Sequence, residues 1–149
     1  MLVENWHQFS PESEHAEGGK SYAVVNKGAE TPEAFAKRVL GELHDRMPIM
    51  VLNDEAHHCY RPAPLEEKLS GEEAKAAQED REEATIWVEG LDKLNNAQGG
   101  RAAGQTKPGI AMCVDLSATP FYLKGSGYVE GSPFPWLVSD FGLVDAIES

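Results

Sequence analysis

The chain has 149 residues, 41% of them hydrophobic, and a formal net charge of −12 that arises from 25 acidic and 13 basic residues. A chain of this length buries about two-thirds of its unfolded surface, enough for one good core, so we expect one domain or most of one. The acidic balance argues against a free-standing module that binds nucleic acid through a basic surface. It does not exclude DNA contact by a larger assembly.

Cysteine usage and hydropathy narrow the class of protein further. Cys59 and Cys113 are too few and too far apart for a CxxC zinc or redox motif or a disulfide framework, which favours a reducing, intracellular setting. No apolar run approaches the roughly 18 residues of a membrane span, and the start, MLVENWHQF, lacks the basic and apolar blocks of a signal peptide. We therefore expect a soluble, cytoplasmic protein.

The first predicted element is an amphipathic helix over residues 31–47, TPEAFAKRVLGELHDRM. Thr31 is suited to cap this helix and Pro32 to its first turn. Its apolar stripe consists of Phe35, Val39, Leu40 and Leu43. The run from Ile49 to Leu52 follows without alternation, which is typical of a strand buried on both faces of a parallel sheet. A helix followed by a buried strand predicts an α/β layer architecture.

The middle of the chain changes in character. Residues 62–83 are rich in charge, and we interpret them as an acidic surface insertion, either a solvated helix or a mobile segment. In residues 84–100, Trp87, Leu91 and Leu94 have helical spacing and favour a helix closed by the glycines at 99 and 100, although Ile86–Val88 alone would fit a strand.

The last third is predicted to contain one more strand. Residues 96–109 carry loop signals, and residues 110–116 read as a second buried strand. Residues 121–136 combine glycines, prolines and aromatics, which predicts an ordered but irregular loop. A final amphipathic stretch, residues 136–149, places four apolar residues on one face: Leu137, Phe141, Val144 and Ile147.

The most informative stretch is VLNDEAHHC, residues 51–59, where a buried strand runs into two acids and two histidines. Carboxylates at this point lie at the carboxyl edge of a parallel sheet, where ligands bind in such folds. The first acid, Asp54, can hold Mg²⁺ through oxygen ligands, and the second, Glu55, can polarise the water that attacks a phosphate.

A zinc site is the rival interpretation, because Glu55, His57, His58 and Cys59 are all competent ligands. The spacing weakens it. Adjacent histidines in a strand-to-turn segment are expected to point to different sides, whereas zinc hydrolases take paired histidines from one helical face, as in HExxH. A third possibility is that these polar residues only cap the strand and hydrogen-bond among themselves.

A second polar segment, SATP at residues 117–120, closes the second predicted strand. The DEAH segment (Asp54–His57) and the SAT segment (Ser117–Thr119) resemble motifs II and III of superfamily 2 helicases and translocases. Within that superfamily, VLNDEAHHCYR, DLSATPFYLKGSG and SPFPWLVSDFGLVDAIES are similar to the helicase-like restriction subunit of type III restriction enzymes, and VENWHQF is similar to a segment upstream of motif II in that group. The resemblance covers nearly the whole chain and thins over the acidic insertion.

The resemblance implies a fold, a cofactor and a role for each matching residue. The fold would be a parallel-sheet RecA-like (P-loop NTPase) motor domain, with residues 1–149 forming the latter part of its first domain. Asp54 would hold the magnesium of Mg-ATP, and Glu55 would orient or activate the hydrolytic water. His57 would lie between the nucleotide site and the SAT segment, where the hydroxyls of Ser117 and Thr119 bind the same network. His58 and Cys59 receive no role.

The chain departs from the family at the phosphate-binding loop. No G-x-x-x-x-G-K-[ST] occurs in these 149 residues, and GQTKPG and KGSGYVEG lack its lysine-hydroxyl ending. The family places this loop before motif II, and a second RecA-like domain with a γ-phosphate arginine after the point where this sequence stops.

We therefore expect a fragment that is inactive alone and belongs to a longer ATP-dependent DNA helicase or translocase associated with a restriction endonuclease. The implied partners are double-stranded DNA and a modification methyltransferase subunit. The alternative from another class is a degenerate, non-catalytic helicase half that serves as an interaction module.

Overall fold

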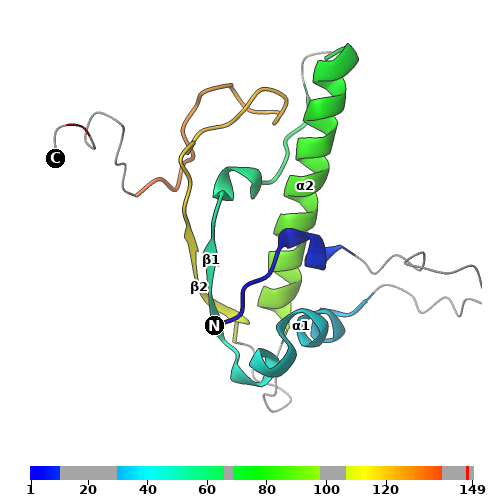
Figure 1. Cartoon of the computed structure of the whole chain (residues 1–149), viewed down its shortest axis with the longest axis vertical. Helices are drawn as coiled ribbons and strands as arrows, with labels where there is room; N and C mark the ends of the chain where they lie inside the picture. The colour runs from blue at the N-terminus through cyan, green and yellow to red at the C-terminus, as the bar shows by residue number, and fades with distance from the viewer. Residues whose placement is uncertain (11–29, 66–68, 98–106, 139–146, 148–149) are drawn as a thin grey trace, which may run out of the picture.

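The computed structural model describes residues 1–10, 30–65, 69–97, 107–138 and 147, and the structural statements below concern this part of the chain. It is an α/β structure in which helices α1 and α2 lie on one side of a small parallel sheet (Figure 1). The elements in chain order are η1 (Trp6–Phe9), α1 (Pro32–Leu40), η2 (Gly41–Arg46), β1 (Ile49–Asn53), η3 (Ala56–His58), α2 (Gly71–Asn96) and β2 (Ile110–Asp115). None of the helices in these ranges is long and apolar enough to cross a bilayer.

Helix α1 confirms the first predicted helix but is shorter than expected. The Thr31 side chain accepts a hydrogen bond from the Ala34 N–H at 3.2 Å, and Pro32 occupies the first turn, as predicted. The α-helix ends at Leu40 because Gly41 adopts a φ of +52°, and the chain continues as the 3₁₀ helix η2. Phe35 and Ala36 are completely buried on the face that packs against α2.

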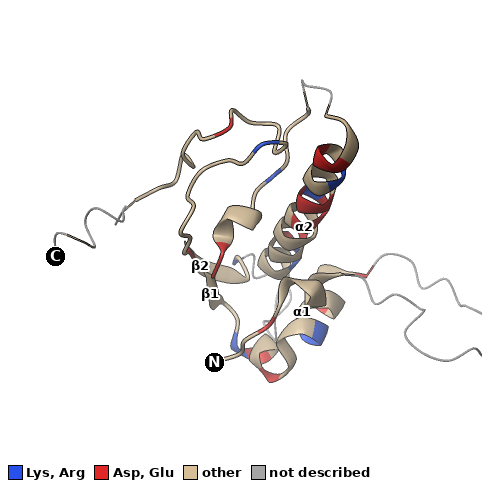
Figure 2. Ribbon diagram, turned by 45° about the horizontal axis from the view of Figure 1, so that its top comes forward, with Lys and Arg blue, Asp and Glu red and all other residues tan. Residues whose placement is uncertain are grey.

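Helix α2 confirms the helix predicted after residue 84 and excludes a strand at Ile86–Val88. It is 26 residues long, because the Glu-, Ala- and Lys-rich residues from Gly71 onward continue the same helix. It ends at Asn96, before the glycines that were predicted to close it. Acidic side chains line its exposed surface (Figure 2), whereas Ala77 and Ala84 are buried.

The two strands form a parallel pair, as predicted, with Val51 opposite Cys113 and Asn53 opposite Asp115. The prediction that they are buried on both faces is wrong for this part of the chain. Met50 and Leu52 are each 59% exposed, and Met112 is 56% exposed. Successive side chains of a strand point to opposite faces, and the described helices cover only one of them.

Two clusters of buried side chains hold the helices to the sheet. The larger cluster joins α1, the end of α2 and the start of the sheet through Phe35, Ala36, Val39, Leu40, Met47, Leu94 and Ala97. The smaller cluster consists of Tyr60, Ala84, Tyr122 and Phe134. Because Tyr60 follows η3 and Tyr122 follows the SAT segment, the smaller cluster packs both of these segments against α2.

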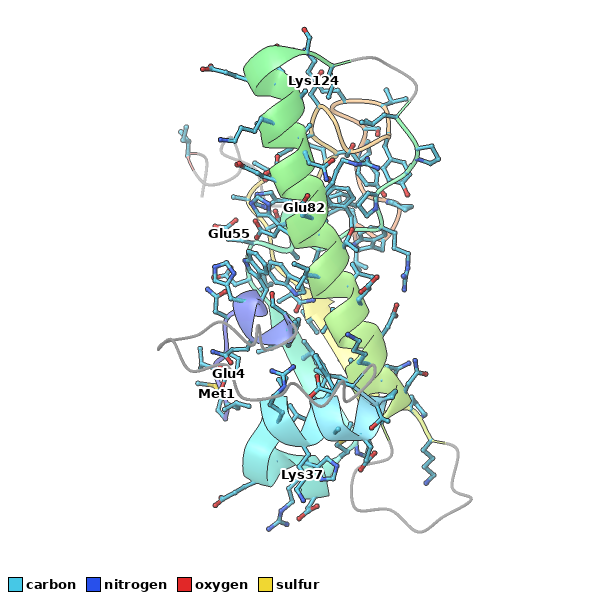
Figure 3. The ribbon with its side chains drawn as sticks, turned by 90° about the vertical axis from the view of Figure 1, so that its right-hand side faces the viewer. Met1, Glu4, Lys37, Glu55, Glu82 and Lys124 are labelled. Carbon is cyan, nitrogen blue, oxygen red and sulfur yellow. The ribbon has the colours of Figure 1, made fainter. Side chains whose placement is uncertain are left out.

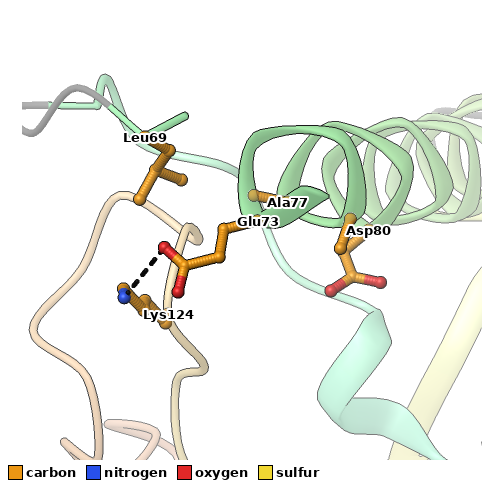
Figure 4. A pocket seen from close by; sticks show the side chains of 6 residues that line it. Leu69, Glu73, Ala77, Asp80 and Lys124 are labelled. Carbon is orange, nitrogen blue, oxygen red and sulfur yellow. Dashed lines mark hydrogen bonds and ion pairs between the residues drawn. The ribbon is translucent and has the colours of Figure 1, made fainter. Parts of the chain in front are cut away.

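Residues 116–138 form an irregular segment that folds back along α2, in agreement with the predicted ordered loop. An antiparallel bridge joins Phe121 to Pro133. The Lys124 ammonium pairs with the Glu73 carboxylate of α2 at 3.3 Å (Figure 4). The loop predicted at 96–109 and the amphipathic stretch at 136–149 lie largely outside the described residues.

Candidate functional site

The carboxyl ends of β1 and β2 bring the DEAH and SAT segments together. The Leu116 N–H donates to the Asn53 carbonyl at 2.8 Å, and the Ala56 N–H donates to the Leu116 carbonyl at 3.0 Å. These bonds continue the parallel ladder past the last residue of each strand. The prediction that Asp54 and Ser117 share one edge of the sheet is therefore confirmed. Figure 3 shows Glu55 level with the middle of α2, between Lys37 near one end of the molecule and Lys124 near the other.

Glu55 adopts a left-handed backbone conformation, with φ of +52° and ψ of +40°. It is the one non-glycine residue with positive φ among those the structure describes. Such a conformation costs about 1–3 kcal/mol outside glycine and occurs preferentially at functional sites. The Asp54 carboxylate accepts a hydrogen bond from the Glu55 N–H at 3.1 Å, which stabilises the turn. Both acidic residues remain exposed to solvent at the end of β1.

His57 connects the two segments. Its Nδ1 lies 3.0 Å from Ser117 Oγ and 3.4 Å from the Glu55 Oε2. The Ser117 hydroxyl also accepts a hydrogen bond from the Thr119 N–H at 3.0 Å. Since a hydroxyl both donates and accepts, Ser117 can donate its proton to a neutral imidazole while it holds the backbone of the SAT segment.

The surroundings of His57 favour its neutral form. Burial lowers the pKa of its imidazole from the ordinary value of 6.5, and the neighbouring His58 lowers that pKa further, against the opposing effect of Glu55. The rings of His57 and His58 lie 4.1 Å apart between centroids. At neutral pH the contact between His57 and Ser117 is thus a hydrogen bond between uncharged groups.

The Thr119 hydroxyl is a buried polar group without a hydrogen-bond partner in the described part of the chain. Leaving such a group unpaired costs about 1–3 kcal/mol, so native structures rarely do so without a reason. The Thr119 hydroxyl, two residues from Ser117 in the same SAT segment, is available to a ligand or to a further part of the network.

A polar network beneath the site was not predicted from the sequence. The Asn53 Nδ2 donates to the Asp115 Oδ1 at 2.8 Å and to the Cys113 Sγ at 3.3 Å, and Asn53 is only 5% exposed. The signal was present, because each apolar run ends in a polar residue and a parallel register places the two opposite each other. This network fixes the ends of the two strands relative to each other.

The structure also bears on the zinc interpretation. The expectation that His57 and His58 point to different sides is wrong: their rings lie together because residues 56–58 form a 3₁₀ turn rather than an extended segment. Burial and the nearby Asp115 raise the pKa of the Cys59 thiol to about 12, which disfavours the thiolate that zinc binds. No group of three or more His, Cys, Asp or Glu side chains suited to a metal occurs in the described ranges.

Comparisons of the chain with protein-family models, with curated proteins and with solved structures gave no match.

Proposed function

We propose that this chain is part of a RecA-like motor domain that couples Mg-ATP hydrolysis to movement on double-stranded DNA. The observation that carries the proposal is the contact of His57 with Ser117, which joins the DEAH and SAT segments at the carboxyl edge of two adjacent parallel strands. A polar edge at this position is where nucleotides bind in parallel α/β sheets. The resemblance of the two segments to motifs II and III is consistent with that geometry.

The residues at the edge fit Mg-ATP in their chemistry. Magnesium prefers oxygen ligands, and Asp54 and Glu55 present two exposed carboxylates at the end of β1. When bound, Mg-ATP supplies the phosphoanhydride bond that water cleaves. Asp54 would hold the magnesium, and the Glu55 carboxylate would accept the proton of the attacking water.

His57 then has a connecting role rather than a role in bond cleavage. Its Nδ1 lies within reach of both the Glu55 carboxylate and the Ser117 hydroxyl. A displacement of Glu55 in the presence of nucleotide would reach Ser117 through the contacts of His57 with both residues. It would reach Thr119 through the hydrogen bond from its N–H to the Ser117 hydroxyl. Among the described residues, the Thr119 hydroxyl is the buried group of this network that has no hydrogen-bond partner.

The acting unit is a longer protein. Phosphoryl transfer requires a phosphate-binding lysine loop and a γ-phosphate arginine besides the magnesium, and these 149 residues contain no such lysine loop. We assign the chain to the restriction subunit of a type III-like restriction endonuclease, a cytoplasmic protein that works with a modification methyltransferase subunit.

Substitution of the two carboxylates in the complete protein tests this assignment. Glu55→Gln keeps the size of the side chain but cannot accept the proton, so we expect ATP binding to persist while turnover falls by about 10²- to 10⁴-fold. Asp54→Asn removes the charge that faces the ion and should also raise the magnesium concentration needed for half-maximal turnover. Measurements of nucleotide affinity and steady-state turnover distinguish the two effects.

Glu89→Gln is the matched control, because Glu89 is an exposed carboxylate on α2 outside the site. It should leave turnover and magnesium dependence unchanged. Wild-type turnover in Glu55→Gln would rule out the proposed mechanism. Stoichiometric zinc in the purified protein, released by His57→Ala, would favour a zinc hydrolase instead.

A non-catalytic interaction module is the second candidate, supported by the exposed apolar face of the sheet at Met50, Leu52 and Met112. An apolar face of this kind is typical of a surface that another protein layer covers. Measurement of ATP turnover distinguishes the two candidates, since an interaction module has no turnover that Glu55→Gln could abolish.

A further inference from the structure

The segments that follow the DEAH and SAT segments meet a second time, away from His57. The Ala63 N–H donates to the Ser126 carbonyl at 3.1 Å, and the Tyr128 hydroxyl donates to the Arg61 carbonyl at 2.9 Å. Arg61 and Ala63 lie a short distance after the DEAH segment, and Ser126 and Tyr128 lie a short distance after the SAT segment. This second junction therefore limits how far the SAT segment can move relative to the DEAH segment.

Arg81 of α2 holds the junction from the side of the helix. Its Nη1 donates to the Ala63 carbonyl at 2.9 Å, to the Ser126 carbonyl at 3.1 Å and to the Gly125 carbonyl at 3.3 Å. One partly buried guanidinium nitrogen thus binds backbone from both segments. Hydrogen bonds from a charged donor are stronger than those between neutral groups, and guanidinium is well suited to several fixed acceptors.

The packing around Arg81 leaves little room for the junction to slide. Gly127 has a φ of +87°, and a Cβ atom there would collide with the Ala63 carbonyl. Gly125, with a φ of +89°, lies directly against the Ala77 side chain of α2. Ser126, between the two glycines, is 1% exposed. The glycines permit a close approach of three backbones that any larger residue would prevent.

Buried aromatic side chains connect the junction back to the site. Tyr60, which directly follows Cys59, packs edge-on against Tyr122 at 6.0 Å between ring centroids. Both rings lie in the same cluster as Ala84, which is one turn along α2 from Arg81.

We infer that Arg81 is a positioning residue that sets the distance between the DEAH and SAT segments, and thereby the contact of His57 with Ser117. The inference rests on the proposed function for the reaction that this contact serves. Arg81 lies in the predicted acidic surface insertion, residues 62–83, so the inference gives a role to a segment that has none in the resemblance. Arg81 acts through backbone carbonyls and has no contact with the carboxylates of Asp54 and Glu55 in the described structure.

Steady-state ATP hydrolysis by the complete protein tests the inference. Arg81→Met keeps most of the aliphatic stem but removes the donors, and we expect kcat to fall by about 10- to 100-fold because a small displacement of reacting groups is costly. KM for ATP should stay within about twofold, since binding groups are untouched. Arg81→Lys keeps one charged donor and should restore part of the lost kcat.

The matched control is Lys75→Met, because Lys75 is an exposed cation on the same helix that pairs with Glu79, one turn further along. It should leave kcat unchanged. All rates are to be measured well below the melting temperature of the least stable variant. If Arg81 only stabilised the fold, Arg81→Met would have the wild-type kcat at temperatures where the variant is fully folded. That result would overturn the inference.

A second measurement is independent of turnover. The NMR ring signals of His57 in Arg81→Met should shift from their wild-type positions while those of His7 remain in place, because only His57 contacts the SAT segment. Unshifted His57 signals would overturn the inference. If Glu55→Gln abolishes turnover and Arg81→Met does not alter kcat, the inference fails and the proposed function stands. If the wild-type protein has no turnover, both fail.

Discussion

His57 lies where three kinds of interaction meet: a hydroxyl at 3.0 Å, a carboxylate at 3.4 Å and the ring of His58. Burial is the largest influence on its protonation, and it favours the neutral ring. A neutral ring can accept the Ser117 proton, whereas a protonated ring can only donate to it. The tautomer and the protonation state of His57 together determine which way the hydrogen bond to the SAT segment runs.

The lowered pKa of His57 predicts how stability depends on pH. The unfolded chain binds a proton at His57 more readily than the folded chain does, so this residue reduces stability as the pH falls below 6.5, the ordinary pKa. Above that value both states are neutral and the effect is absent. His57→Gln should lose less stability than the wild type on acidification, as measured by urea unfolding over a series of pH values.

An NMR titration checks the same prediction directly. The His57 ring should titrate below 6.5. The other histidines are common to the wild type and His57→Gln, so their contributions cancel in the comparison. A His57 pKa above 6.5, or a wild type that loses no more stability than the variant, would contradict the assigned environment.

The individual side chains of the site were predictable because each lies directly after an apolar run. Asp54, Glu55 and Ser117 lie where a strand-end motif places them. The left-handed backbone of Glu55 and the pairing of Asn53 with Asp115 were not predicted. The pairing depends on the register of the two strands, which the apolar runs indicate but do not fix, whereas the backbone angle of Glu55 is a local conformation that its residue type does not reveal.

Helix α2 is the element that supports the site, and it combines two stretches of different composition. Its first half is acidic, and exposed pairs such as Lys75 with Glu79 at 3.7 Å and Gln78 with Glu82 at 2.7 Å follow the helical repeat. Its buried position in this half is the small Ala77, and the next buried position, just after this half, is Ala84. Alanine gives little hydrophobic signal, so the sequence indicated a surface insertion, whereas one face of it packs against the loop after β2.

Ala84 gives the sharpest test of this packing. It is completely buried in the cluster with Tyr60 and Tyr122, so Ala84→Leu should destabilise the fold by about 1–3 kcal/mol through overpacking. Ala76→Leu is the matched control on an exposed position of the same helix, and it should change stability by less than about 0.5 kcal/mol. Urea unfolding of the two variants measures the difference. Equal effects would show that this face of α2 is not packed as described.

At the scale of the whole molecule, the described helices cover one side of the sheet and leave the other uncovered (Figure 1). Parallel sheets are almost always covered on both faces, and two strands alone rarely form a stable sheet. The α/β class and the parallel pairing were predictable from the alternation of helical and apolar segments. The exposure of Met50 and Leu52 was not, because a run of apolar residues does not reveal which layers are present to cover it.

At this scale we propose that the site belongs to a DNA-dependent ATPase. A motor couples its two ligands, so DNA that favours the active arrangement must raise the rate of ATP hydrolysis, or the coupling does not exist. The contact between His57 and Ser117 is the described connection through which such coupling would act.

The most direct test is therefore the ATP turnover of the complete protein with and without double-stranded DNA. For the proposed motor we expect magnesium-dependent turnover that DNA stimulates and that Glu55→Gln abolishes under both conditions. Absence of turnover, or turnover that is the same with DNA, without DNA and in Glu55→Gln, would contradict it.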